Sequence, residues 1–321
     1  MRNSTRVRRT AVAATGALCL LALSACGAAE TGKKDVGGSK TVNLTVPSWV
    51  GAEANVAVAT HLLEKELDYK VKPQQMGEVL AWDALSKGDT DAILEDWGHP
   101  KQEKQYVADK KTVVKGGDLG VTGHIGWFVP KYFADKHPDV TEWKNLNKYA
   151  DDFKTSESGG KGGLLEGSPD YVTNDDAIIK NLKLNYKTKY AGSEAAQITE
   201  IKQNYKAKKP FITYWWNPQW LNSQVKLVEV KLPKHTDGCD ADKKTIKCGY
   251  PNTPLQKYFN ADFAKDGGNA ATFLKNFQWT TKDQNKVAQM IAGEKLSPDA
   301  AAAKWVKENP DVWKKWMPKK K

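Results

Sequence analysis

Arginine is almost missing from this chain of 321 residues. All four arginines (Arg2, Arg6, Arg8 and Arg9) lie in the first nine positions, and none follows them. Arginine is the usual donor for base readout and for bidentate contact with phosphate, so its absence argues against a nucleic-acid-binding protein. The formal charge of +11 does not change this, because without residues 1–25 the chain has 45 lysines against 38 acidic residues, a net charge of +7.

Motifs that mark several enzyme classes are missing as well. The sequence contains no G-x-S-x-G, H-E-x-x-H, P-loop or C-x-x-C pattern, and the glycine cluster at 159–163 is predicted to be a plain loop. The five histidines are scattered, and only His99 and His124 follow predicted strand regions, where a pocket residue is expected. We therefore predict neither an enzyme nor a bound metal or cofactor.

One acidic cluster, made of Asp89, Asp91, Glu95 and Asp96, stands out. Its spacing lacks the glycine and the terminal glutamate of a calcium loop. Glu95 and Asp96 point to opposite faces of an extended chain, so they do not form an obvious acid–base pair. We interpret the cluster as solvated or hydrogen-bonding acids, with a role near a ligand as the alternative.

The N-terminus has the pattern of a bacterial signal peptide. A basic segment at 2–9 precedes an apolar stretch at 11–25 that is too short for a comfortable membrane span. The stretch ends in L-S-A-C at 23–26, which resembles the lipobox of bacterial lipoproteins. We predict a signal peptide at 1–25, lipidation at Cys26 and a flexible tether at 26–40, with an ordinary secretory peptide as the alternative. The mature chain is then expected at the outer face of the cytoplasmic membrane.

Two further cysteines, Cys239 and Cys248, lie in a loop-like stretch. Export to an oxidising compartment predicts a local disulfide between them. A zinc site is the weaker alternative, because only His235 lies near this pair in the sequence.

The body of the chain begins as alternating strands and helices. Alternating apolar residues at 41–47 predict a strand, and residues 54–67 place apolar side chains on one face of a helix. The elements predicted next are a short strand at residue 71, a helix at 79–87 that ends at Gly88, and strands at 91–94 and 124–129. This alternation predicts α/β layers with a mostly parallel sheet.

The later part of the body is predicted to be loose between residues 130 and 170. The elements predicted after it are a helix opened by a capping box at 173–176, a helix at 193–208, strands at 210–216 and 225–230, and tail helices opened by a capping box at 281–284 and by Ser297-Pro298. No long linker divides the chain into two halves. We therefore expect two α/β lobes that share the chain more than once.

All 12 tryptophans lie in the part without arginine. Those near predicted strand ends are Trp49, Trp97, Trp127, Trp215, Trp216 and Trp220. Ligands of open α/β sheets bind beyond the carboxyl ends of the strands, so several of these indoles are expected at one crevice. Indole faces attract a desolvated cation, and a quaternary ammonium suits them because it has no N–H donors to satisfy. Sugar stacking and plain packing are the alternatives on these residues alone.

Longer stretches of the chain identify a family. The chain resembles the substrate-binding lipoproteins of ABC importers for glycine betaine, proline betaine, carnitine and choline, in WVGAEANVAVATHLLEKELDYKV, LSKGDTDAILEDWGHP, GHIGWFVPKY, GSPDYVTNDDAIIKNLKLNYK and PFITYWWNPQWLNSQVKLVEVKLP. The resemblance covers residues 41–317. It implies a type II periplasmic-binding-protein fold, with two α/β lobes, two hinge crossings and a ligand cleft between the lobes. Lobe one is expected at 41–126 plus 226–321 and lobe two at 127–225.

The resemblance also implies an aromatic cage at the cleft. The cage residues carried onto this chain are Trp49, Trp97, Trp127 and Trp216, with Trp215 as a substitute for Trp216 and Tyr171 as a fifth candidate. Relatives often read W-x-P-H-W, where the histidine helps to hold a ligand carboxylate, and Gln219 stands in that place here. The choice between zwitterionic betaines and cationic choline is therefore left open.

The expectation is a receptor that captures a small quaternary-ammonium solute and delivers it to the permease and ATPase of an ABC importer. It is expected to be a monomer that is held at the membrane through Cys26 and binds no nucleic acid, metal or cofactor. A receptor for another small polar solute, such as an amino acid or an ectoine-like compound, is the alternative within this class. An exported sugar-active hydrolase is the alternative outside it.

Overall fold

The computed structural model describes residues 40–319. Within them, nine strands form one sheet in the order β2-β1-β3-β9-β4-β7-β5-β6, and β8 pairs with β4. The strands are β1 (Thr41–Val46), β2 (Lys70–Gln75), β3 (Ala92–Asp96), β4 (Val113–Pro130), β5 (Gly162–Glu166), β6 (Tyr186–Tyr190), β7 (Ile212–Asn217), β8 (Leu227–Val230) and β9 (Asn252–Asn260). The predicted signal peptide, Cys26 and all of the tether but its last residue lie outside the described residues.

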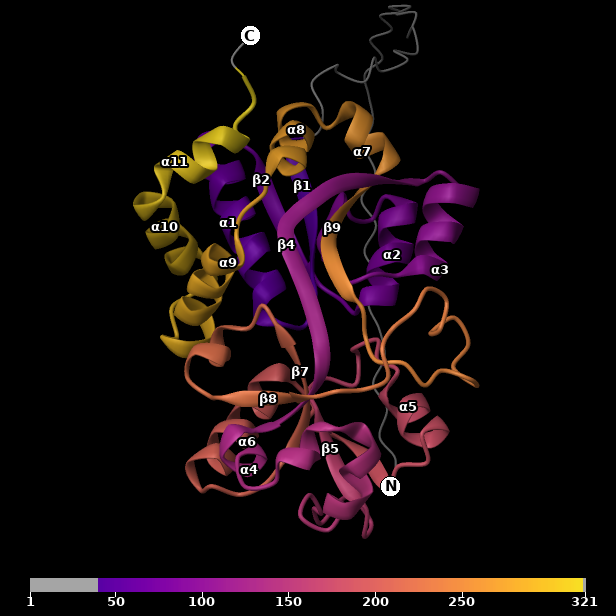
Figure 1. The fold of residues 1–321 in the computed structure, drawn as a ribbon. Coiled ribbons are helices and arrows are strands. Elements are labelled where there is room, and N and C mark those ends of the chain that lie inside the picture. The colour runs from indigo at the N-terminus through magenta and orange to yellow at the C-terminus, as the bar shows by residue number, and fades with distance from the viewer. Residues whose placement is uncertain (1–39, 320–321) are drawn as a thin grey trace, which may run out of the picture. The chain divides into compact units, whose positions relative to one another are not determined.

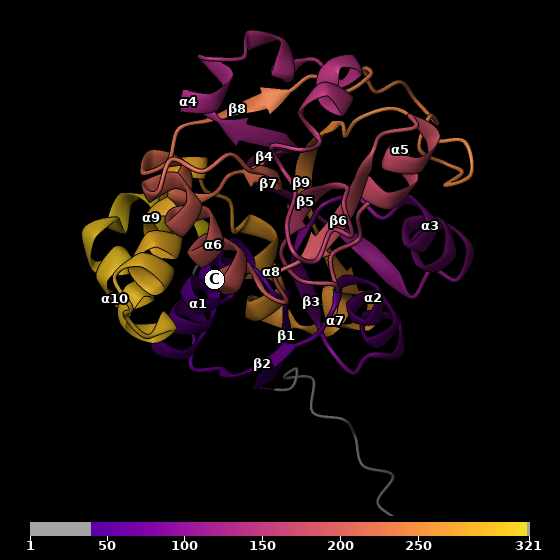
Figure 2. The same cartoon turned by 90° about the horizontal axis from the view of Figure 1, so that it is seen from below.

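Helices pack on both sides of this sheet. The α-helices are α1 (Val50–Glu66), α2 (Glu78–Lys87), α3 (Pro100–Gln102), α4 (Lys131–Ala134), α5 (Asp175–Asn181), α6 (Glu194–Lys206), α7 (Ala261–Asp266), α8 (Gly268–Asn276), α9 (Thr281–Ala288), α10 (Pro298–Glu308) and α11 (Pro310–Trp313). Around β1, β3 and β9, helices α1, α9 and α10 lie on one side, and α2 and α3 lie on the other (Figure 2). Between residues 40 and 319, no helix is both long and apolar enough to cross a membrane.

Strand β4 connects the two ends of the molecule. Its first part pairs with β9, and its last part pairs with β7 and β8, always antiparallel. Early and late elements of the chain gather around one end of β4, and the middle elements gather around the other end (Figure 1). The chain therefore contributes twice to the first of these halves.

Three hydrophobic clusters form the core of the described residues. The smallest lies around Trp82, Ile93 and Tyr258. The largest packs β1, α1, α8 and α10 together through residues such as Leu44, Val58 and Phe273, and it also takes in residues of the middle part, such as Ile198 and Trp215. The second contains Trp127, Phe133, Leu146, Ile178, Val230, Ile246 and Cys248. The segment around residues 230–248 thus packs with the middle part of the chain.

Local signals in the sequence predict several helix ends correctly. Gly88 ends α2 with φ +80, where a residue without Cβ is favoured; its N–H donates to the Leu85 carbonyl, and the Asp89 N–H donates to the Ala84 carbonyl. Ser193 and Ser297 cap α6 and α10 through their hydroxyls. These signals succeed because each depends only on neighbouring residues.

Other local predictions are wrong. The sheet is mixed: β1, β2 and β3 are parallel as predicted, but the antiparallel strands β9 and β4 lie between them and the parallel strands β5, β6 and β7. The sequence predicts neither β9 nor the first half of β4. Gly116, Gly117 and Gly120 in β4 are typical of a loop. Register shifts also interrupt the pairing of β4 with β9.

Predictions from glycine and capping signals are wrong at three other places. Gly162 and Gly163 belong to the buried strand β5, and a Cβ at Gly162 would meet the Tyr186 ring at 2.6 Å. The capping box of α9 joins Thr280 and Asp283, one residue before the predicted one. Helix α5 begins after Asn174 and has no side-chain cap.

Candidate functional site

A cavity of about 530 Å³ lies beyond the ends of several strands. Trp49 follows β1, Trp97 follows β3, Tyr171 lies between β5 and α5, and Trp216 lies near the end of β7; all four line this cavity. This is where open α/β sheets place their ligands. The structure therefore brings four of the seven predicted ligand-binding residues together.

Several of the rings that line the cavity contact one another, most of them edge to face. Tyr171 meets Trp49 with ring centroids 6.1 Å apart at 76°, and it meets Trp216 at 5.8 Å and 87°. Tyr214 continues the wall, 5.9 Å from Trp216 and 6.0 Å from Tyr250. Such contacts favour a fixed wall of rings, because each ring edge rests on a neighbouring face.

Strand alternation decides between the two adjacent tryptophans of β7. Trp216 and Tyr214 both line the cavity, as residues two apart on one face of a strand do. Trp215 faces the other way, is buried, and donates its indole N–H to Asn222 Oδ1 at 2.7 Å. Of this pair, Trp216 is therefore the cavity residue.

Two further predicted residues are buried beside the cavity and do not line it. Trp127 is fully buried in the second hydrophobic cluster, where its indole N–H donates to Asp175 Oδ1 at 2.8 Å. Gln219 donates from Nε2 to Glu194 Oε1 at 2.5 Å and accepts the Leu221 N–H at 2.9 Å. Neither is among the described residues that line the cavity.

The indole N–H groups of Trp49 and Trp97 point to the same buried carboxylate. Both donate to Glu95 Oε1, at 2.7 and 2.8 Å. Glu95 Oε2 accepts from Asn55 Nδ2 and from Gln284 Nε2. Burial raises the pKa of Glu95, and these hydrogen bonds oppose that effect. The acid that the sequence could not place therefore holds two cavity residues.

A buried histidine forms another charged part of the wall. His99 lines the cavity, and its Nδ1 lies 2.6 Å from Asp96 Oδ2 while its Nε2 lies 3.2 Å from Glu78 Oε2. Burial disfavours the imidazolium, but hydrogen bonds and charge from Asp96 and Glu78 outweigh it and raise the pKa of His99 to about 10. Glu78 also accepts the Val172 N–H at 3.2 Å, which connects α2 to the loop that carries Tyr171.

A second group of buried acids, Asp175 and Glu166, lies behind the part of the cavity wall that Tyr250 forms. Tyr250 donates its hydroxyl to Asp175 Oδ1 at 2.6 Å and accepts the Asn174 N–H at 2.9 Å. Burial raises the pKa of Asp175, and burial with the charges of Asp175 and Asp176 raises the pKa of Glu166 to about 9. The Tyr250 hydroxyl is therefore bound to a buried acid that is not among the described residues lining the cavity.

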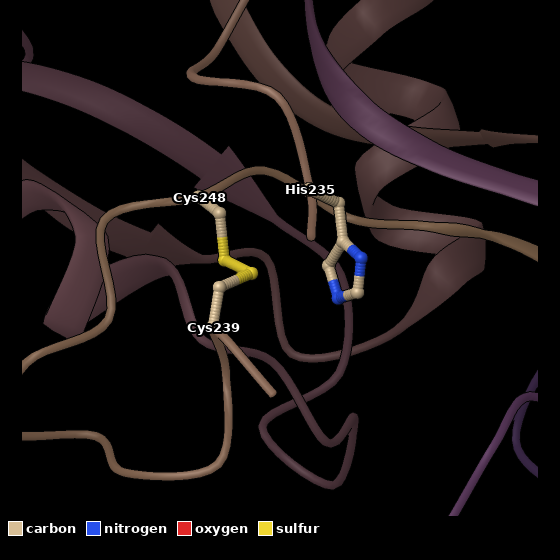
Figure 3. Close-up of side chains that lie close together, drawn as sticks. All are labelled: His235, Cys239 and Cys248. Carbon is tan, nitrogen blue, oxygen red and sulfur yellow. A yellow bond between two sulfur atoms is a disulfide. The ribbon is translucent and has the colours of Figure 1, made fainter. Parts of the chain in front are cut away.

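Cys239 and Cys248 form a disulfide, and His235 lies beside it (Figure 3). The three side chains lie close enough to share a metal ion. However, sulfurs bonded to each other are not the thiolates that zinc requires, so this geometry does not fit zinc. The loop that the disulfide closes supplies Asp240, Ala241 and Lys243 to the cavity wall, and Asp237 lies just before it.

Tyr214, Tyr250 and Glu78 are cavity residues that the sequence did not indicate. Tyr214 had a detectable signal, because it lies two residues before Trp216 on a predicted strand. The sequence gives no such signal for Tyr250 or Glu78, since each reaches the cavity only through tertiary packing.

Comparisons with known proteins find relatives of this chain. Residues 40–308 match the family model described as the substrate binding domain of an ABC-type glycine betaine transport system. The chain is 30% identical over 244 residues to the trimethylamine N-oxide-binding protein of Pelagibacter ubique, which covers 72% of this chain and 76% of that protein.

Solved structures share the fold. Lactococcal OpuAC, in its closed conformation with glycine betaine, aligns with a TM-score of 0.69 and 22% identity over 87% of this chain and all of that one. An ABC-transporter choline-binding protein in complex with choline aligns with a TM-score of 0.71 and 19% identity over 86% of this chain and 91% of that one. The predicted type II periplasmic-binding-protein fold is confirmed.

Proposed function

The chain belongs to the family of substrate binding domains of ABC-type glycine betaine transport systems, and from this membership we propose that it captures a quaternary-ammonium solute in the aromatic cavity. Like other binding proteins of ABC importers, it acts outside the cytoplasmic membrane. The proposed ligand cage consists of Trp49, Trp97, Tyr171 and Trp216, with Tyr214 and Tyr250 completing the wall. Trp127, Trp215 and Gln219 support the fold and are left out of the cage.

The observation that carries this proposal is the convergence of four aromatic rings from four separate chain segments on one cavity. An enclosed cation gains about 0.5–2 kcal/mol from each ring face that it contacts. Methyl groups on the nitrogen add buried apolar area, and they need no hydrogen-bond acceptors. A trimethylammonium head satisfies both conditions at once.

The anionic end of a betaine would need a different partner from the one its relatives use. Gln219 is engaged by Glu194 and by the Leu221 N–H, so it does not replace the histidine of the W-x-P-H-W pattern. Relatives carry names that specify trimethylamine N-oxide, glycine betaine and choline. We propose this group of small trimethylammonium compounds as the ligand class.

We propose two lobes that close on the ligand, at 41–126 with 226–321 and at 127–225. The hydrophobic clusters support one amendment, because Val230, Ile246 and Cys248 pack with Trp127. The segment 226–251 then moves with the second lobe, and β4 and the start of β9 form the crossings. Closure excludes water from the cage and strengthens the cation–ring attraction.

The proposal also covers how the protein is attached to the membrane and where it delivers the solute. We propose that the protein is a monomer, that Cys26 carries a lipid, and that the permease and ATPase of the same importer receive the solute. It performs no bond chemistry. Its homologues are solute-binding proteins, and no catalytic motif occurs in the sequence.

Calorimetric titration tests the ligand class. Glycine betaine, proline betaine, carnitine, choline, trimethylamine N-oxide and ectoine are each titrated into the full mature chain. Saturation at one ligand per chain by at least one trimethylammonium compound, with a change in tryptophan fluorescence and no product over time, is the expected result. Binding of ectoine or an amino acid alone, or steady product formation from an oligosaccharide, would refute the proposal.

A further inference from the structure

Glu95 lies behind the cage, one residue before the end of β3. Only 3% of its surface is exposed, and it is not among the described residues that line the cavity. It therefore does not touch a ligand there. Its contacts are instead with the residues that do.

The carboxylate of Glu95 connects two cage residues from separate loops. Trp49 follows β1 and Trp97 follows β3, and Glu95 Oε1 accepts both indole N–H groups at 2.7 and 2.8 Å. One oxygen atom thereby fixes the in-plane orientation of both rings. Any shift of this atom moves both walls of the cage together.

The second oxygen anchors the carboxylate itself. Oε2 accepts from Asn55 on α1 and from Gln284 at the first turn of α9. Four N–H donors thus face the two oxygens, which is the environment of an ionised carboxylate. The charge is buried, and both indoles donate directly to it.

A charged acceptor changes the rings that donate to it. A hydrogen bond to a carboxylate polarises the donor group, and it does so more strongly where the dielectric is low. For an indole this makes the π face more negative, and the negative face is what attracts a cation. The full charge of Glu95 adds its own field from behind the rings.

We infer that Glu95 is a positioning residue that aligns Trp49 and Trp97 and makes the cage select positively charged head groups over neutral groups of the same shape. This inference rests on the proposed function, since it requires that the cage binds a trimethylammonium group. It assigns the preference for positively charged ligands to a residue that is not among those described as lining the cavity. The neighbouring Asp96 serves a different purpose, because it accepts from Trp82 and His99.

Glu95→Gln removes the charge while keeping the shape. The glutamine oxygen can still accept both indole N–H groups. Its amide group then faces Asn55 and Gln284, whose oxygens Oδ1 and Oε1 are buried without a hydrogen-bond partner among the described residues. Rotating these two amides by half a turn lets them accept, so the variant is expected to fold.

The test compares ligands that differ in charge alone. Choline is paired with 3,3-dimethylbutan-1-ol, and glycine betaine is paired with 3,3-dimethylbutanoate, in which carbon replaces nitrogen. For wild type and Glu95→Gln, titration calorimetry gives the affinities, and near-ultraviolet circular dichroism reports the indole environment. Asp283→Asn is the matched control, because Asp283 accepts the Trp305 indole N–H at 3.3 Å outside the cavity wall and lies beside Gln284.

Glu95→Gln is expected to weaken binding of the trimethylammonium ligand about tenfold, the effect of one unit charge removed from roughly 10 Å away. Binding of the carbon isostere and the dichroism are expected to stay unchanged, and Asp283→Asn is expected to change neither affinity. Unchanged trimethylammonium affinity in Glu95→Gln would overturn the inference, and so would an equal loss for both members of a pair. Failure of wild type to bind any trimethylammonium ligand would instead refute the proposed function.

Discussion

The side-chain amide of Gln219 donates to the buried carboxylate of Glu194, with Nε2 2.5 Å from Oε1. Glu194 Oε2 in turn accepts the Val50 N–H, at the first residue of α1 and directly after Trp49. Gln219 thus reaches the cage only through the backbone beside Trp49. We therefore assign Gln219 to the support of the proposed cage and not to its ligand-contacting surface.

Gln219→Ala is expected to lower the free energy of unfolding by about 1–3 kcal/mol, because it leaves the buried Glu194 carboxylate short of a donor. Affinities for glycine betaine and choline are expected to fall by the same factor. Urea denaturation and titration calorimetry measure the two effects. A loss confined to glycine betaine would show direct contact with a ligand carboxylate and contradict this assignment.

Removing a cage ring is expected to reduce affinity strongly. Trp49→Ala, Trp97→Ala and Trp216→Ala should each weaken trimethylammonium binding by about tenfold to a hundredfold, since each removes a ring face and buried apolar contact. Fluorescence titration gives the affinities.

Two buried tryptophans serve as controls for the cage variants. Trp127→Phe and Trp215→Phe change fully buried rings that do not line the cavity. Both should lower the melting temperature while keeping the affinity within about threefold, because no ligand contact is lost. Normal affinity in all three alanine variants would refute the cage.

The Glu166 carboxyl predicts how stability depends on pH. Burial and the charges of Asp175 and Asp176 raise its pKa from 4.5 to about 9. The folded state therefore keeps a proton that the unfolded state releases. The resulting stabilisation is full below about pH 4.5 and is lost as the pH rises toward about 9.

Glu166→Gln removes this dependence, because a glutamine has no proton to lose. Between about pH 5 and pH 8.5, the free energy of unfolding of wild type should fall more steeply than that of the variant, by up to about 1.4 kcal/mol per pH unit. Urea denaturation at several pH values measures this, and Glu157→Gln, on a side chain that is 63% exposed, is the control. Parallel curves for wild type and Glu166→Gln would contradict the prediction.

The disulfide is expected to stabilise the wall that carries Asp237 and Asp240. Replacing Cys239 and Cys248 together by serine should cost about 2.5 kcal/mol, the value expected for so short a loop. Affinity should fall about threefold or more, because the loop contributes to the cavity. Reduction of wild type by dithiothreitol should reproduce the change, and unaltered stability after confirmed reduction would contradict it.

The parts of the fold that the sequence predicted depend on short-range patterns. Strand β1, helix α2 with its Gly88 end, and the caps at Ser193 and Ser297 follow from neighbouring residues. Strand β9 and the first half of β4 were missed because their stability comes from pairing with each other, at a distance of more than a hundred residues. The glycines in the first half of β4, which are typical of a loop, are tolerated within this paired strand.

The same division applies to the site. Trp49, Trp97 and Trp216 could be proposed from the sequence because they lie at strand ends, and Tyr214 was within reach by alternation. The roles of Glu95, Asp175 and Gln219 could not be predicted, because each is defined by partners from distant segments. Glu95 alone joins residues from two loops and two helices.

The sequence by itself determined the residue types of the site: tryptophans in abundance, almost no arginine, and stretches that identify the family. Those features favour a ligand that aromatic ring faces can hold, and both the number of rings and the scarcity of guanidinium groups can be counted in the sequence. The tertiary structure alone decided which rings face the cavity and which acids stand behind them. Burial and hydrogen bonding arise only when distant segments pack, and a single sequence does not show that packing.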